Sequence, residues 1–232
     1  MAKPVKKSDR NKEWRKDRNS RSRARSIAPE YHLIVSEGTE TEPNYFKGMK
    51  DEIERNNAAY ADKITVNVEQ RHKGMNTIDL VKHAEQKVKD ALRKSNKIYK
   101  HVWIVYDKDD FKDNDFDKAV KECENLTSET TEYHAIWSNE SFELWFLLHF
   151  RTQNVDIHRE NYGKELTKYL KTDYKKNDKD IYVRLRPELD TAIKNAEKIM
   201  EPYVNKQPSQ CRPGTKVYEI LKKLRPYLKS GK

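Results

Sequence analysis

Residues 31–46 read YHLIVSEGTETEPNYF, and this stretch changes from a strand pattern to a helix pattern within a few residues. The apolar run at residues 32–35 predicts a short buried strand. It ends at Ser36-Glu37-Gly38, and apolar residues at helical spacing begin after Pro43. In open α/β sheets, ligands bind outside the carboxyl ends of the strands. Glu37 is therefore the first candidate for a functional side chain.

Three more strand patterns follow, at residues 64–68, 101–106 and 133–137, with helical patterns between them at about 44–56, 77–92 and 116–126. Residues 71–74 predict a polar turn. Residues 141–150, SFELWFLLHF, are apolar around the whole helix circumference and predict a buried helix. The alternation predicts an α/β fold with a mostly parallel four-stranded sheet and helices on both faces.

The chain divides into three predicted parts. Residues 1–28 form a basic, flexible arm, residues 29–150 the α/β domain, and residues 151–232 a helical extension packed on that domain. The extension shows amphipathic helical patterns near residues 162–170, 187–203 and 215–228.

The composition is polar, with 37% charged and 35% hydrophobic residues. No window approaches the roughly 18 apolar residues of a membrane span, and the N-terminus lacks the apolar core of a signal peptide. We therefore expect a cytoplasmic protein without a membrane partner. Cys123 and Cys211 are the only cysteines, which favours two reduced thiols over a disulfide framework or a thiolate zinc site.

The net charge of +10 is concentrated in the arm. Residues 1–26 hold eleven Lys or Arg against three acidic residues, which leaves only +2 for the rest of the chain. Such an arm is typical of nucleic-acid binding through phosphates, although a solvated tail that aids solubility is the alternative. The predicted nucleic-acid-binding residues are Arg15, Lys16, Arg18, Arg21, Arg23 and Arg25.

Acidic residues follow two of the predicted strands. Glu37 comes after the first, and Asp107, Asp109 and Asp110 come after the third. In a parallel sheet both groups lie at the same edge, and oxygen ligands of this kind suit Mg²⁺ or Mn²⁺. The alternatives are that Glu37 caps the following helix and that the Asp run is a solvated turn.

Two other interpretations of the Asp run fit its spacing poorly. An EF-hand loop that began at Asp107 would need Gly at its sixth position and Glu at its twelfth, where Lys112 and Lys118 stand. A haloacid-dehalogenase phosphatase would close its DxDx motif with Thr or Val, where Phe111 stands, so this match is poor but stays open.

Three segments together resemble one family: EGTETEPNYF at residues 37–46, VWIVYDKDD at 102–110 and SNESFELWFLLHF at 138–150. They resemble the RloB-like family of bacterial anti-phage defence proteins, over about residues 31–150, and residues 215–217 with the following helix resemble its C-terminal motif. The resemblance implies a Toprim-type fold in which Glu37 serves acid–base chemistry or metal binding, and Asp107 and Asp109 hold Mg²⁺. It also implies partnership with a defence ATPase.

Four further residues carry expectations, Glu143 and Glu140 from the same resemblance and His149 and Glu42 from their positions on helices. Glu143 matches the family's Phe-Glu pair and is a further candidate ligand, with a buried ion pair as the alternative. Asn139 is followed by Glu140 where family members commonly have proline, so an added carboxylate is expected near the site. His149, on an apolar helix, is expected to be a core residue, and Glu42 is expected to complement the helix dipole rather than bind metal.

We therefore expect a metal-dependent nuclease that acts on RNA, tRNA included, or on DNA. The predicted metal ligands are Glu37, Asp107, Asp109, Asp110 and Glu143, with Glu37, Asp107 and Asp109 in catalytic roles. Two alternatives stay open, a nucleic-acid-binding adaptor whose site is vestigial and a small phosphohydrolase.

Overall fold

The structure is a computed structural model that describes residues 30–68, 76–108 and 112–228. The predicted turn at residues 71–74 therefore lies outside the described residues. None of the helices in these three ranges has the length and apolar character that crossing a membrane requires.

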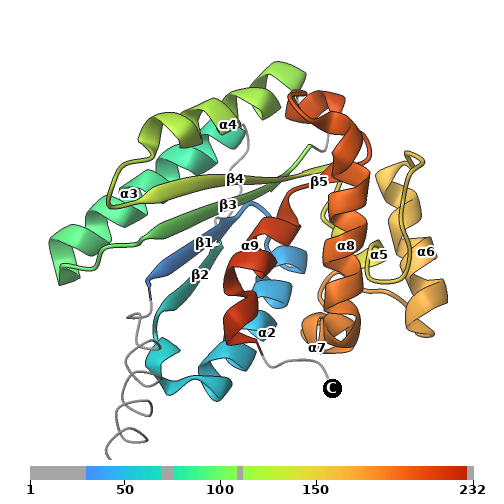
Figure 1. The fold of residues 1–232 in the computed structure, drawn as a ribbon, viewed down its shortest axis with the longest axis horizontal. Coiled ribbons are helices and arrows are strands. Elements are labelled where there is room, and N and C mark those ends of the chain that lie inside the picture. Colours follow the sequence, from blue (N-terminus) through green and yellow to red (C-terminus); the bar gives the residue numbers. More distant parts are fainter. Residues whose placement is uncertain (1–29, 69–75, 109–111, 229–232) are drawn as a thin grey trace, which may run out of the picture.

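The described residues form one five-stranded sheet in the order β2-β1-β3-β4-β5 (Figure 1). The first four strands are parallel, as predicted, and β5 is antiparallel to β4. The predicted number of four strands is wrong because β5 was missed: it has two residues, too few to show an alternating pattern. The strands are β1 (His32–Ser36), β2 (Ile64–Val68), β3 (His101–Asp107), β4 (Glu132–Asn139) and β5 (Gly214–Thr215).

Helices cover both faces of this sheet, which confirms the α/β prediction (Figure 1). The α-helices are α2 (Thr41–Asn56), α3 (Thr77–Ser95), α4 (Asp113–Leu126), α5 (Glu143–Leu147), α6 (Arg159–Leu170), α7 (Ile181–Leu185), α8 (Leu189–Met200) and α9 (Val217–Leu224). Within the described ranges, short 3-10 helices occupy Ala58–Tyr60, Arg186–Glu188, Glu201–Tyr203, Pro208–Gln210 and Arg225–Tyr227.

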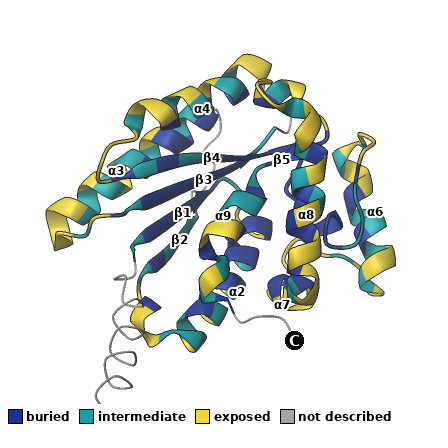
Figure 2. Cartoon of the chain, in the orientation of Figure 1, coloured by how far each residue is buried: buried dark blue, intermediate teal, exposed yellow. Residues whose placement is uncertain are grey.

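The two faces of the sheet bury different helices. Helices α3 and α4 pack on one face, against Leu33, Val102 and Ile104. Helices α2, α5, α7, α8 and α9 pack on the other, where Ile34 and Val105 belong to the larger core. Because both faces are covered, β1 and β3 are almost continuously apolar and buried along their length (Figure 2).

The C-terminal segment completes this larger core. Strand β5 pairs with the end of β4, and α8 and α9 bury Ile193, Ile220 and Leu221 in the same cluster as Tyr45 and Phe46 of α2. The sheet core is therefore built from residues on both sides of position 150.

Residues 141–149 are buried as predicted and Phe150 is half-buried, but the α-helix covers only Glu143–Leu147. Turns continue on either side of it. His149 is a core residue, as predicted: its Nδ1 lies 3.0 Å from the Trp145 carbonyl oxygen, and burial lowers its pKa to about 4.

Candidate functional site

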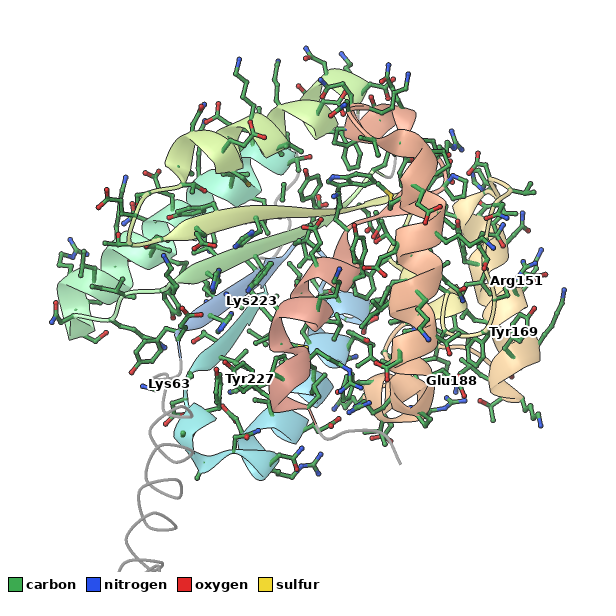
Figure 3. The ribbon with its side chains drawn as sticks, viewed as in Figure 1. Lys63, Arg151, Tyr169, Glu188, Lys223 and Tyr227 are labelled. Atoms are coloured by element: carbon green, nitrogen blue, oxygen red, sulfur yellow. The ribbon has the colours of Figure 1, made fainter. Side chains whose placement is uncertain are left out.

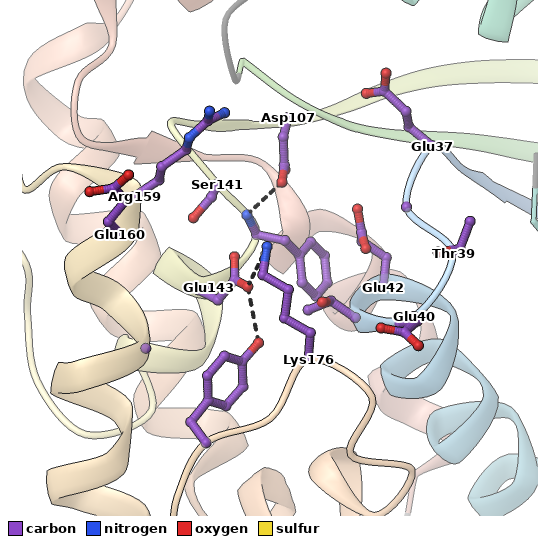
Figure 4. Close-up of a pocket in the computed structure, with 15 residues that line it drawn as sticks. Glu37, Thr39, Glu40, Glu42, Asp107, Ser141, Glu143, Arg159, Glu160 and Lys176 are labelled. Carbon is purple, nitrogen blue, oxygen red and sulfur yellow. Dashed lines mark hydrogen bonds and ion pairs between the residues drawn. The ribbon is translucent and has the colours of Figure 1, made fainter. Parts of the chain in front are cut away.

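A pocket of about 640 Å³ lies at the carboxyl edge of the parallel strands (Figure 4). Its walls come from the β1–α2 loop, the end of β3, the start of α5, the start of α6 and the loop between α6 and α7. Acidic side chains outnumber basic ones. The acidic residues are Glu37, Glu40, Glu42, Asp107, Glu143 and Glu160, and the basic ones are Arg159 and Lys176.

The strand register brings Glu37 and Asp107 to this pocket. Ser36 is the Cα partner of Val105, and the Glu37 N–H donates to the Val105 carbonyl at 3.1 Å. Asp107 is the last residue of β3, and its Oδ2 accepts a hydrogen bond from the Phe142 N–H at 3.0 Å. Two residues from separate strand ends, chosen from the sequence, thus line one cavity.

Glu42 belongs to the same cavity and is more buried than either of them, with 5% of its surface exposed. It stands in the first turn of α2, and from the sequence it is expected only to complement the helix dipole. Its carboxylate folds back over Gly38, where an added Cβ would lie 2.0 Å from Glu42 Oε2. Glycine at position 38 therefore makes room for this carboxylate.

Glu143 enters the pocket from the start of α5 and is also buried. It accepts a hydrogen bond from the Tyr174 hydroxyl at 3.0 Å, and the Lys176 ammonium lies 3.7 Å from its Oε1 (Figure 4). Glu143 is a candidate metal ligand from the sequence, but the sequence does not indicate these two partners, which stand in the loop between α6 and α7. Nothing in that loop's sequence indicates that it returns to the sheet edge.

The carboxylates of this pocket influence one another electrostatically. Burial, together with the charges of Glu143 and Glu37, raises the pKa of Glu42 to about 7, although its own backbone N–H and Lys176 act against the rise. Burial and the Glu143 carboxylate likewise raise the pKa of Tyr174. The pocket therefore holds more negative charge than its own cations neutralise.

Other predicted residues fall elsewhere. Asp109 and Asp110 lie outside the described residues, as do the arm residues Arg15, Lys16, Arg18, Arg21, Arg23 and Arg25. Glu140 does not line the pocket. It accepts a hydrogen bond from the Arg159 N–H at 2.9 Å and pairs with Arg212, so it holds the start of α6.

Within the part of the chain that the structure describes, the closest group of possible metal-ligand atoms lies outside this pocket. Among the residues described, three such side chains approach within 4.8 Å of one another at His101, Glu132 and His134. These residues lie at the beginning of the ladder between β3 and β4, at the opposite edge of the sheet, and no pattern in the sequence indicates them. Only the register of the folded strands brings residues so distant in the chain together.

The comparisons with known proteins give one match. A family model described as RloB-like protein matches residues 32–224, which is most of the chain and includes every described residue of the pocket. No curated protein and no solved structure matches.

Proposed function

The chain belongs to the RloB-like protein family, and we propose that it is a metal-dependent nuclease that acts on RNA or DNA in anti-phage defence. The observation that carries the proposal is the acidic pocket at the carboxyl edge of the sheet. Its buried Glu42 has a pKa raised to about 7, because this carboxylate is desolvated beside two others. Perturbed carboxylates in a cleft are typical of functional sites.

The donor set of the pocket fits Mg²⁺ or Mn²⁺. Glu42, Asp107 and Glu143 offer hard oxygen ligands, and a divalent cation would relieve the repulsion that raises the pKa of Glu42. Glu37 lines the same pocket. Mg²⁺ usually takes one or two protein carboxylates and keeps several waters, so it does not need three carboxylates in mutual contact. When bound, the ion would polarise a phosphate and lower the pKa of a bound water.

The remaining side chains have roles that follow from their charge. Glu37 is a metal ligand or the base that accepts a proton from the attacking water. Arg159 and Lys176 are the cations of the pocket, and they would hold the oxygens of the phosphodiester. Asp109 and Asp110 keep their predicted role as further ligands.

The test is a cleavage assay on purified protein. Labelled tRNA, single-stranded RNA and plasmid DNA are each incubated with Mg²⁺, with Mn²⁺ and with EDTA. Cleavage is expected only with metal, and Glu37→Gln, Asp107→Asn and Glu42→Gln should each lower it by at least about tenfold. The matched control is Glu124→Gln, an exposed carboxylate on α4 on the opposite face of the sheet, which should cleave like the wild type.

The alternatives give different results in the same assay. An adaptor binds nucleic acid equally well in EDTA and cleaves nothing, also when a defence ATPase partner is added. A small phosphohydrolase turns over a chromogenic phosphate ester and leaves nucleic acid intact. Equal cleavage by the wild type and all three pocket variants would show that the pocket is not the active site.

A further inference from the structure

A second group of metal-ligand side chains lies at the amino edge of the sheet. His101 and Glu132 are the first residues of β3 and β4, and they are Cα partners across these strands. His134 follows two residues after Glu132, so the two side chains stand on the same face of β4. The register therefore places two imidazoles and one carboxylate side by side.

The three ligand atoms are spaced as around a single ion. His101 Nδ1 lies 3.1 Å from His134 Nε2 and 3.3 Å from Glu132 Oε2, and the latter two atoms are 3.7 Å apart. Zinc bonds of about 2.0–2.2 Å at tetrahedral angles separate ligand atoms by about 3.3–3.6 Å. The observed triangle matches one face of such a tetrahedron within a few tenths of an ångström.

The contact of His101 with Glu30 determines which of its ring nitrogens faces the other two ligands. His101 Nε2 lies 3.2 Å from Glu30 Oε2, while its Nδ1 faces His134 and Glu132. A neutral imidazole has one proton, so a proton on Nε2 for Glu30 leaves a lone pair on Nδ1, which can accept from His134 Nε2–H or bind a cation. The Nδ1 atom is directed at the point where the His134 and Glu132 ligand atoms also meet, which is where an ion would bind.

Both rings are held in position by their neighbours. The His134 ring stacks on Trp103, with 4.1 Å between centroids. Glu30, which contacts His101, is paired at 3.5 Å with Lys223 of α9, a helix that lies over the strands (Figure 3). A carboxylate on the outer nitrogen of a histidine is the arrangement that orients histidine ligands around metals.

We propose that His101, His134 and Glu132 bind one Zn²⁺ or a similar divalent transition-metal ion, with Glu30 orienting His101 from outside the ligand set. Two imidazoles and a carboxylate are the ligands of open zinc sites, which keep a fourth position for water. The Glu132 side chain is 39% exposed, so solvent reaches the site. His32 is not a ligand, because its Nδ1 accepts a hydrogen bond from Trp103 Nε1 at 3.2 Å.

This site is separate from the proposed nuclease centre. His101 and Asp107 are the first and last residues of β3, which puts the two sites roughly 20 Å apart at about 3.3 Å per residue. Zinc would join the starts of β3 and β4 and leave the acidic pocket open to Mg²⁺. A zinc measurement is therefore independent of whether the chain cleaves nucleic acid.

The test measures zinc directly. Full-length protein is stripped with EDTA, dialysed and titrated with Zn²⁺ against a chromophoric chelator, in a large excess of Mg²⁺ that occupies the oxygen ligands of the pocket. We expect one Zn²⁺ per chain, bound at least about tenfold more weakly by Glu132→Gln and by His134→Gln. The control is His158→Gln, which removes an exposed histidine that also pairs with a carboxylate, Glu160, at 3.9 Å, and zinc binding should be unchanged.

Cobalt gives a second readout on the unaltered chain. Co²⁺ at this site should show the intense visible absorption of a four-coordinate ion, whereas the pale spectrum of six oxygen ligands would overturn the proposal. Absence of zinc uptake by the wild type would also overturn it, as would undiminished zinc binding by both ligand variants. Far-UV circular dichroism of the metal-free variants tests whether they are folded. If a variant is not folded, the cobalt spectrum of the unaltered chain tests the proposal in its place.

Discussion

At the scale of single residues, Gly38 and Glu42 depend on each other. The Glu42 carboxylate occupies the space that a side chain at position 38 would need. Because Glu42 is 5% exposed, its carboxylate has little room to move without leaving the pocket. Glycine at position 38 is therefore needed to leave space for the Glu42 carboxylate, and not to allow the backbone conformation of a turn.

Gly38→Ala should displace Glu42, since the new Cβ would stand 2.0 Å from its Oε2. We expect metal-dependent cleavage to fall at least about tenfold with a change in stability of at most about 1 kcal/mol, because the clash is relieved by one side chain. Cleavage assays and urea unfolding measure the two effects. Gly163→Ala is the matched control: its Cβ would meet Tyr174 Cδ1 at an ordinary 3.5 Å, so equal losses in both variants would contradict the argument.

The raised pKa of Glu42 has a consequence for stability. The folded-state pKa of about 7 exceeds the ordinary value of 4.5, so folding favours the protonated carboxyl. This contribution is fully present below about pH 4.5 and is lost as the pH rises through 7. At about 1.4 kcal/mol per pKa unit, the metal-free wild type loses up to about 3 kcal/mol over this range.

Glu42→Gln should remove that loss. In EDTA, urea unfolding should find the variant more stable than the wild type at pH 8, by up to about 3 kcal/mol, and nearly equal to it at pH 4.5. Titrating groups far from the pocket are common to both proteins and cancel in the difference, whereas the neighbouring carboxylates Glu37 and Glu143 lose a repulsive charge in the variant, which adds to its advantage at pH 8. A difference in unfolding free energy that does not change with pH would show that Glu42 titrates normally.

At the scale of elements, a charged network joins α2 to α7. Glu52 accepts hydrogen bonds from the Tyr182 hydroxyl at 2.7 Å and from Arg186 Nε and Nη2 at 2.7 and 3.0 Å. The side chains of Glu52 and Arg186 are only 14% and 16% exposed, so solvent screens this bidentate pair weakly. The network fixes the short α7 against the helix that carries Glu42.

Glu52→Ala should lower the free energy of unfolding by about 2–4 kcal/mol, because it leaves Arg186 and Tyr182 partly buried without their acceptor. Chemical denaturation measures the loss. Glu85→Ala on α3 removes a more exposed carboxylate, paired with Lys89 at 2.6 Å, and should cost about 0.5 kcal/mol. Similar losses in the two variants would mean that the network contributes no more than a surface pair.

The elements that the sequence predicted are those with a clear period or a long apolar run. The four parallel strands and helix α3 are of this kind, and α3 also begins with a capping box between Asn76 and Asp79. Helix α7 has five residues and β5 has two, so neither spans enough turns or pleats to show a period. Their positions are decided by tertiary packing, since Ile181 and Tyr182 fill the core beside α2.

The same limit applies to side chains that meet across the sheet: their meeting can be predicted only where a pattern in the sequence indicates it. Glu37 and Asp107 could be paired from the sequence because both follow strands, and parallel strands end at one edge. His101 and His134 could not, because their meeting depends on the register of β3 against β4, which parallel strands do not reveal in their sequences. Tyr174 and Lys176 reach the pocket through a loop, whose path no periodicity predicts.

At the scale of the whole molecule, the larger core joins residues from both sides of position 150. A chain that ends at residue 150 would lack β5, α8 and α9, and would expose the apolar face of the sheet around Ile34 and Phe46. We expect such a fragment to unfold without a cooperative transition, whereas the full chain unfolds in one. Circular dichroism during urea unfolding distinguishes the two outcomes, and a cooperative fragment would identify residues 29–150 as an independent domain.

Charge is divided between the arm and the pocket, and this division predicts how the protein binds nucleic acid. The arm carries +8 of the net +10, whereas the pocket is acidic and would repel a phosphate in the absence of metal. Affinity should therefore come largely from the arm, and deletion of residues 2–26 should flatten the dependence of log K on log salt concentration by about 0.7–0.9 for each phosphate that the arm had neutralised.

Replacing Arg15, Lys16, Arg18, Arg21, Arg23 and Arg25 by Gln keeps the length of the arm and should have a similar effect if charge is the cause. Fluorescence anisotropy over a range of salt concentrations measures the slope, and an unchanged slope in both variants would place the phosphate-binding residues on the folded body.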